Sequence, residues 1–192
     1  MSPPKADDLV ARDRTHLTFL HEAGAAAVRH NSEADLLPHL LGTRDLLREW
    51  GARPALQDAG LFHSVYGTEF FVTATLPAAR QAEVRAVIGA EAEALVRLWC
   101  FGRRYSLTAS LAGETEPRMQ DRRDEEWASL TEGQLEDLLN LWIADTLEQL
   151  HRVLEREVPI ALELMRYRDR ALPRARVALE AAVRGLQSQR EP

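Results

Sequence analysis

Apolar residues recur at intervals of three and four positions along most of this 192-residue chain, which is the period of an amphipathic helix. In the segment from Ala34 to Trp50, for example, Leu36, Leu40 and Leu47 share one helical face. Leu, Ala, Arg and Glu predominate and only 6% of the residues are aromatic, so the residue types that favour strands are sparse. The sequence therefore predicts an all-α fold.

Glycine, proline and capping residues divide the chain into a series of expected helices. Gly24 and Gly51 are typical stop signals, whereas Pro54 suits the first turn of a helix. Thr131 and Gln134 form a capping-box pattern at the start of the longest helix. The expected helices span residues 6–24, 34–50, 54–64, 77–88, 91–101 and 131–153, and two closing helices begin at Pro159 and Pro173.

Two segments depart from this helical pattern. Residues 65–76 are richer in aromatic and β-branched side chains, but no partner strand is evident, so we expect a loop there. Residues 113–126 carry almost no core-forming side chains, and we expect them to form a mobile insertion or a connecting loop.

Charge and cysteine content exclude several classes of protein. A net charge of -6 argues against a general nucleic-acid binder, which would carry a basic stripe. Cys100 is the single cysteine, so no intramolecular disulfide and no cysteine-rich zinc site can form. The first ten residues contain no targeting pattern, and no apolar run is long enough to span a membrane. We therefore expect a cytoplasmic protein without a membrane or nucleic-acid partner.

Three polar residues fall on or beside faces where core residues are expected. His39 lies on the apolar face of its helix, His63 lies beside an apolar face, and Asp145 borders the apolar stripe of the longest helix. Taken singly, a core-facing His is more often a structural hydrogen-bonding residue, and a border Asp is more often solvated. Together, two imidazoles and a carboxylate from three core helices form a natural ligand set for a divalent metal.

The order and spacing of these three residues carry a family resemblance. His39 is followed 24 residues later by His63 within AGLFHS, and Asp145 lies within LWIADTLEQ. This resembles the H…HD…D pattern of the HD-domain superfamily, especially the hydrolase domain of RelA/SpoT-type alarmone enzymes. It also resembles a group of short HD-like proteins with HS in place of HD. The segment AEVRAVIGAEAEALV, residues 82–96, is similar to the stretch that links the family's motifs.

The resemblance implies an HD-domain-like helical bundle that forms a single domain over residues 1–192. Its HD-like core covers about residues 25–155, and residues 159–188 form closing helices. It also implies one divalent ion (Mn, Mg or Fe) held by His39, His63 and Asp145.

The chain departs from the family pattern beside His63. The family has Asp after this His, whereas position 64 is Ser, a poorer ligand that stays a candidate for an additional metal contact. The family's Glu-Asp pair is replaced by Gly67 and Thr68, which leaves Glu69 as the catalytic candidate for water activation or, alternatively, as a replacement ligand.

Further polar residues are candidates for binding a substrate. Gln149 matches the family's Asn four residues after its Asp, and the others lie near helix ends or in the loop after His63. The remaining candidates are Arg29, His30, Tyr66, Arg103 and Arg104. A solvated loop or an arginine that complements a helix C-terminus is the competing interpretation for the arginines.

Three functions stay open at this point. The first is a divergent metal-dependent hydrolase of a phosphorylated small molecule or nucleotide. The second is an iron- or metal-dependent tailoring enzyme of small-molecule metabolism on the same fold. The third is a catalytically inactive module that binds or senses a ligand. A homodimer through the exposed C-terminal helices is a further option.

Overall fold

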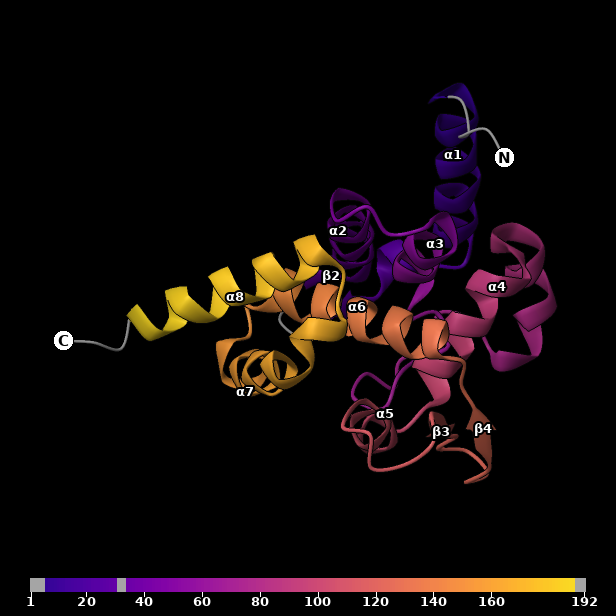
Figure 1. Ribbon diagram of the computed structural model, residues 1–192. Coiled ribbons are helices and arrows are strands. Elements are labelled where there is room, and N and C mark those ends of the chain that lie inside the picture. Colours follow the sequence, from indigo (N-terminus) through magenta and orange to yellow (C-terminus); the bar gives the residue numbers. More distant parts are fainter. Residues whose placement is uncertain (1–5, 31–33, 189–192) are drawn as a thin grey trace.

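The computed structural model describes residues 6–30 and 34–188, and it is dominated by helices (Figure 1). This part of the chain has eight α-helices, three short 3-10 helices and two small antiparallel ribbons. The all-α prediction is therefore confirmed. The α-helices are α1 (Ala6–Glu22), α2 (Leu36–Glu49), α3 (Pro54–Phe62), α4 (Gln81–Phe101), α5 (Arg104–Leu111), α6 (Glu132–Gln149), α7 (Leu154–Leu164) and α8 (Pro173–Ser188).

The remaining elements are short. The 3-10 helices are η1 (Ala25–Ala27), η2 (Ala78–Arg80) and η3 (Met165–Arg170). One ribbon pairs β1 (Arg29–His30) with β2 (Ala34–Asp35), and the other pairs β3 (Arg118–Gln120) with β4 (Trp127–Ser129).

Helix α6 forms the centre of the molecule. In Figure 1 it crosses the middle, with α1 to α3 on one side and α5 with the β3–β4 hairpin on the other. It contacts α2, α3, α4, α5, α7 and α8, and most of its residues from Leu135 to Ala144 are buried. The capping box predicted for Thr131 and Gln134 is present at its start. A central helix that touches so many others brings distant parts of the sequence to one place.

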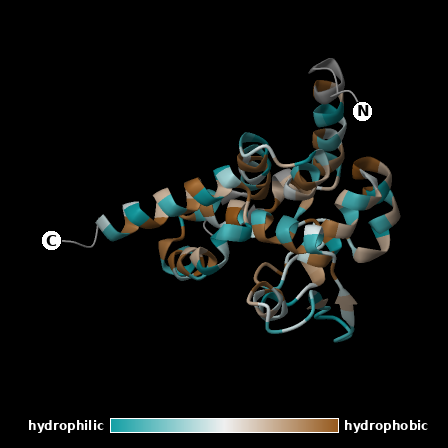
Figure 2. Ribbon diagram, in the orientation of Figure 1, coloured by the Kyte–Doolittle hydropathy of each residue, from teal (hydrophilic) through white to brown (hydrophobic). Residues whose placement is uncertain are grey.

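Helix α8 shows the amphipathic pattern of a helix that closes over a core. Figure 2 shows hydrophobic and hydrophilic stretches alternating along it. Its buried residues Ala175, Leu179 and Val183 recur at intervals of four, and Pro173 stands at its first position as predicted.

The close packing of α2 against α3 positions His39 and His63. Gly60 of α3 faces α2, and a Cβ added there would lie 2.6 Å from Leu47 Cδ1. Glycine therefore allows α2 and α3 to pack closely. The buried face of α2 includes His39, and most residues of α3 from Leu56 to Phe62 are buried.

Several predicted boundaries shift in the structure. The closing helix expected to begin at Pro159 begins at Leu154 instead, and Pro159 lies inside it. Burial of Val158, Ala161 and Leu164 outweighs the one backbone hydrogen bond that proline removes. The helix expected over residues 131–153 ends at Gln149. The predicted break between residues 88 and 91 is confirmed, because Gly89 interrupts α4 with φ 84° and ψ 164°.

The segment around residues 103–129 is more ordered than predicted. Helix α5 was not foreseen, and residues 118–129 form the β3–β4 hairpin rather than an unstructured insertion. Serines of α5 hold the hairpin, because Ser110 Oγ donates to Arg118 O at 2.8 Å and Ser106 Oγ accepts from Gln120 N at 3.0 Å. The prediction relied on apolar side chains, which are sparse in this segment, whereas hydrogen bonds from serine hydroxyls hold the hairpin in place.

Candidate functional site

Two histidines and one aspartate converge at the centre of the described structure. His39 comes from α2, His63 directly follows α3, and Asp145 lies on α6. His39 Nε2 is 3.0 Å from His63 Nε2, and Asp145 Oδ1 is 3.1 Å and 3.3 Å from these two nitrogens. Both histidines are 1% exposed. The structure thus brings together the three residues that the motif order singled out.

The Nδ1 atoms of His39 and His63 make hydrogen bonds that orient both imidazole rings toward Asp145. His63 Nδ1 donates to the Gly60 carbonyl oxygen at 2.6 Å, and His39 Nδ1 donates to Glu148 Oε2. Because Nδ1 carries the proton in each ring, the neutral histidines turn their Nε2 lone pairs toward Asp145. Two lone pairs and a carboxylate oxygen at this separation require a shared proton or a cation.

When no cation is bound, a proton shared among the two Nε2 atoms and the Asp145 carboxylate fills this role. Burial lowers the pKa of His39, but its hydrogen bonds to Asp145 and Glu148 outweigh burial and raise the pKa to about 9. Burial opposes ionisation of Asp145 as well, yet its hydrogen bonds to both histidines hold its pKa well below the usual range. The metal-free cluster therefore binds one proton tightly at neutral pH.

The spacing of the three ligand atoms also suits a divalent cation. Adjacent ligands of an octahedral ion lie about 3.0 Å apart when each is about 2.1 Å from the metal, and a tetrahedral ion gives about 3.4 Å. The observed separations of 3.0, 3.1 and 3.3 Å fall within this interval. All three atoms belong to residue types that bind such ions, so His39, His63 and Asp145 fit a divalent metal.

Glu148, which was not among the predicted site residues, orients His39. It lies three residues after Asp145 on α6, so both carboxylates face the same side of the helix. Arg152, one turn further on, donates to the same Glu148 oxygen that accepts from His39. A Cβ on Gly42 would lie 2.7 Å from Glu148 Cγ, so glycine leaves the room that this carboxylate occupies. Gly42, a glycine inside a predicted helix, is the feature of the sequence that could have indicated this contact.

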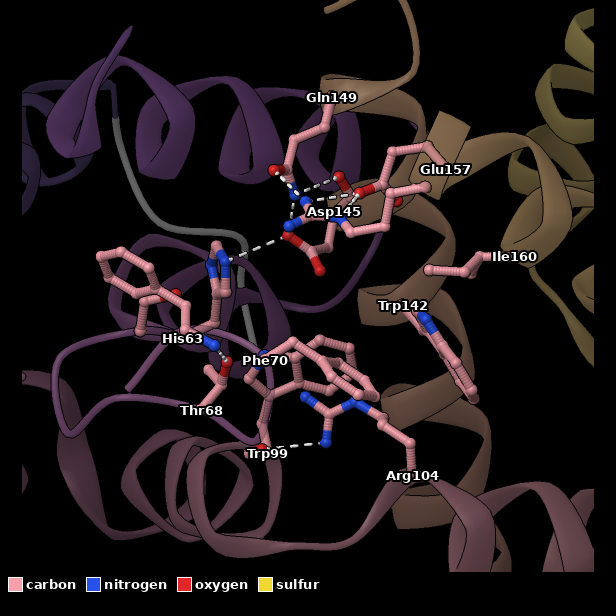
Figure 3. Close-up of a pocket in the computed structure, with 13 residues that line it drawn as sticks. His63, Thr68, Phe70, Trp99, Arg104, Trp142, Asp145, Gln149, Glu157 and Ile160 are labelled. Atoms are coloured by element: carbon pink, nitrogen blue, oxygen red, sulfur yellow. Dashed lines mark hydrogen bonds and ion pairs between the residues drawn. The ribbon is translucent and has the colours of Figure 1, made fainter. Parts of the chain in front are cut away.

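A cavity of about 120 Å³ opens beside the cluster, and Figure 3 shows the side chains that line it. His63, Asp145 and Ser64 are among its lining residues. Much of the remaining wall is aromatic or aliphatic. The apolar lining residues are Phe70, Phe71, Trp99, Trp142 and Ile160.

Arg104 is the cationic residue most firmly fixed in this wall. Its guanidinium carbon lies 3.5 Å from the centre of the Trp99 ring, and its Nη1 donates to the carbonyl oxygens of Trp99 and Gly102 at 3.0 and 3.3 Å. Burial lowers its pKa to about 10, so it stays charged at neutral pH. Arg104 was one of the predicted substrate-binding candidates, and it lines the cavity.

A chain of polar contacts connects Asp145 to helix α7. Gln149 Nε2 donates to Asp145 Oδ1 at 3.0 Å, and Arg156 Nη2 donates to Gln149 Oε1 at 2.7 Å. Arg156 also pairs with Glu157 Oε1 at 2.5 Å. Burial and the nearby charge of Asp145 raise the pKa of Glu157. Figure 3 shows Asp145, Gln149 and Glu157 grouped in its upper part. Gln149 was predicted here, whereas Arg156 and Glu157 were not.

Glu69, Arg103 and Tyr66 lie apart from the cavity wall. Glu69 Oε2 accepts from Arg104 N at 2.7 Å at the start of α5, and its other oxygen is 3.8 Å from Arg103 Nη1. Tyr66 is buried and stacks on Phe101 with ring centres 5.5 Å apart. None of these three side chains is among those that line the cavity. The sequence placed Glu69 and Tyr66 in the right loop, but the packing of that loop on α4 and α5 turns them elsewhere.

The other predicted candidates have different outcomes. Ser64, the candidate for an additional metal contact, lines the cavity together with Thr68 from the same loop. The loop expected over residues 65–76 is an irregular segment. Arg29 and His30 form β1, and their side chains lie outside the described part of the structure.

Comparisons with known proteins bear on the fold. A family model described as a domain of unknown function (DUF6817) matches residues 19–104, less than half of the chain. No curated protein matches the sequence. A solved structure of a metazoan ortholog of SpoT, described as hydrolysing ppGpp and as having a role in starvation responses, aligns with a TM-score of 0.56. The two chains are 15% identical, and the alignment covers 99% of this chain and 98% of the other.

The chain has an HD-like all-α fold. At 15% identity, the alignment over nearly the full length of both chains establishes this fold and leaves the activity open. None of the described helices combines the length and the apolar character that crossing a bilayer requires.

Proposed function

We propose that this protein is a divergent metal-dependent hydrolase of a phosphorylated small molecule. The observation that carries the proposal is the convergence of three ligand atoms within 4.8 Å of one another, two of them, from His63 and Asp145, on residues that line a cavity whose wall also contains the buried Arg104. The HD-like fold and the description of the metazoan structure as hydrolysing ppGpp support it.

In this proposal each residue of the site has a distinct task. His39, His63 and Asp145 hold one divalent ion (Mn, Mg or Fe), which supplies Lewis-acid chemistry to a phosphoryl group when bound. Glu148 keeps His39 in the tautomer that offers Nε2, and the Gly60 carbonyl does the same for His63. Arg104 contacts phosphoryl oxygens from the cavity wall.

The reaction would be hydrolysis of a phosphate ester. Water adds to phosphorus, the bond between phosphorus and the ester oxygen breaks, and the proton lost by the water ends on the alcohol that leaves. A proton acceptor must therefore lie beside the cavity. Glu157 lines the cavity with a raised pKa, and Glu69 contacts α5 with both carboxylate oxygens. We accordingly place the proton transfer on Glu157 rather than on Glu69, the acceptor that the sequence favoured.

Metal content and phosphate release test the proposal. Purified protein reconstituted with Mn²⁺ is expected to hold one ion per chain and to release phosphate from members of a panel of phosphorylated nucleotides and smaller phosphate esters. His63→Ala should lose the ion, whereas His151→Ala, which removes an exposed histidine, should retain it. Absence of a stoichiometric ion in the unmodified protein would contradict the proposal and favour a ligand-binding module.

The assignment of the proton acceptor has its own test. Glu157→Gln should lower the maximal rate of phosphate release and remove the acidic limb of its pH profile, while Glu69→Gln should leave that limb in place. The opposite result would return the role to Glu69.

One observation favours a second candidate, an iron- or metal-dependent tailoring enzyme. Ser64 stands where the family has a carboxylate, and the cavity wall is largely aromatic. Three protein ligands leave further coordination positions for a substrate. Iron loading without oxygen, followed by measurement of O₂ consumption against a panel of small aromatic acids, tests it. Consumption of O₂ together with absence of phosphate release would favour this candidate over the hydrolase.

A further inference from the structure

The guanidinium of Arg104 is a buried charge without a carboxylate partner in the described structure. The residue is 5% exposed. Its guanidinium donates to the carbonyl oxygens of Trp99 and Gly102 and lies 3.5 Å from the centre of the Trp99 ring and 6.0 Å from that of Trp142. Glu69 lies nearby but accepts from the Arg104 backbone N–H rather than from its guanidinium. Burying an unpaired charge costs several kcal/mol, so such a group is typically completed by an anion.

The other cation of the cavity wall is already neutralised. Arg156 pairs with Glu157 and donates to Gln149, so it offers little charge to a ligand. Both arginines line the same cavity, but among the described residues Arg156 is paired with a carboxylate and Arg104 is not.

A sum of charges then limits the ligand. A divalent ion on His39, His63 and Asp145 would carry a net charge of about +1, because both imidazoles are neutral ligands and the carboxylate contributes -1. Arg104 adds about +1 from the wall. A total near +2 matches a single phosphate monoester, which carries close to two negative charges at neutral pH. It does not match a polyphosphate, which would bring more negative charge than the described side chains balance.

The rest of the wall indicates what the phosphate is attached to. Trp142 and Ile160 lie on the side of the cavity away from His63 in Figure 3, and Phe70 also lines the cavity. Phe70 is 61% exposed, which is unusual for a large apolar ring. A cavity of about 120 Å³ is smaller than a nucleotide site, so the part of the ester group that it holds is compact and lies against these apolar side chains.

From these observations we infer that the site takes a compact phosphate monoester with an aromatic or apolar ester group, and that Arg104 anchors its phosphate. This inference rests on the proposed function for the role of the metal, but the Arg104 contact is a property of the protein alone. It distinguishes this protein from an enzyme that acts on a nucleotide with several phosphates.

Binding of phenylphosphonate tests the inference without any turnover, since its carbon–phosphorus bond cannot be cleaved as an ester. Isothermal titration of the Mn²⁺-loaded protein should show phenylphosphonate binding at least 10-fold more tightly than methylphosphonate and than inorganic tripolyphosphate. Tripolyphosphate binding as tightly as phenylphosphonate, or no difference between the phenyl and methyl compounds, would overturn the inference.

Variants of Arg104 identify the anchor. Arg104→Met keeps the stack on Trp99 without the charge and should weaken phenylphosphonate binding at least 10-fold, in the metal-loaded protein and in the presence of EDTA. Arg118 provides the matched control, because it also stacks on a tryptophan, Trp127, but on the exposed hairpin. Arg118→Met should leave binding unchanged. An unchanged affinity in a folded Arg104→Met variant would overturn the assignment.

The inference and the proposed function can fail separately. If Arg104→Met does not fold, the selectivity of the unmodified protein among the three ligands still decides the inference. If the protein binds metal and releases phosphate but prefers tripolyphosphate, the proposed function stands and the inference falls. If phenylphosphonate binds through Arg104 in EDTA but no metal binds, the anchor stands and the hydrolase proposal falls.

Discussion

Metal binding to the His39, His63 and Asp145 cluster should release a proton and therefore strengthen as pH rises. In the metal-free protein burial lowers the pKa of His39, but its hydrogen bonds to Asp145 and Glu148 outweigh burial and raise the pKa to about 9. A cation that binds Nε2 must displace that proton. Affinity should then increase until the pH passes about 9 and level off above it.

The size of the effect follows from this pKa. The fraction of His39 that is already deprotonated rises about 30-fold between pH 6.5 and pH 8.0, which corresponds to about 2 kcal/mol of metal-binding free energy. Isothermal titration with Mn²⁺ in two buffers of different ionisation enthalpy measures both the affinity and the protons released. We expect release of close to one proton per ion at pH 7.

Glu148→Gln sharpens the test. The amide oxygen can still accept from His39 Nδ1, but the negative charge that helps to raise the pKa of His39 is lost. The variant should bind metal about 10-fold to 100-fold more weakly above pH 9, where His39 has lost its proton in both proteins. The difference should shrink at lower pH, because the lower pKa of His39 in the variant also reduces competition from the proton. Glu83→Gln in the first turn of α4 is the control, since Glu83 is an exposed carboxylate that pairs with Arg80. Metal affinity that is flat across this pH range, with no proton released, would refute the reasoning.

The same contacts lead to three further predictions. In EDTA the free energy of unfolding should fall by up to about 3 kcal/mol as pH rises from 6.5 through 9, because the raised pKa of His39 stabilises the protonated folded state. Chemical denaturation at several pH values measures this change, and a rise over this range would contradict it. Gly42→Ala should displace Glu148 and weaken metal binding about 10-fold or more, whereas Gly185→Ala, with open space at its Cβ, should only raise the melting temperature slightly. Burial raises the pKa of Cys100 to about 12, so the native protein should not react with iodoacetamide at pH 8, although the unfolded chain should; rapid labelling of folded protein would be inconsistent with the buried thiol.

The helices and the three central polar residues could be predicted because both leave a periodic trace in the sequence. A histidine on an apolar helical face, such as His39, interrupts a regular spacing of leucines and is visible from that spacing alone. The start of α6 at Thr131 and the break at Gly89 follow from residue types whose backbone preferences are strong.

The parts that were missed depend on contacts between distant segments. Glu157 reaches the cavity because α7 begins at Leu154 and packs against α6, and no local pattern encodes that contact. Glu69 was a candidate for the catalytic base or for a replacement ligand because of its place along the chain after His63, and the unforeseen helix α5 offers it the Arg104 backbone N–H. An N–H at a helix start is a strong partner for a carboxylate, so local hydrogen bonding decided where Glu69 lies.

Ser64 connects the metal site to the choice of ligand. It lines the cavity beside His63, where a carboxylate would add a ligand and a negative charge. Ser64→Asp should therefore strengthen Mn²⁺ binding about 10-fold or more while weakening phenylphosphonate binding by a similar factor, because the net charge available to the phosphate falls from about +2 to about +1. Ser64→Asn, of nearly the same shape as the Asp variant but neutral, should leave both affinities closer to those of the unmodified protein. A gain in both affinities in the Asp variant would show that charge balance does not select the ligand, and the preference for a single phosphate would then need a different physical cause.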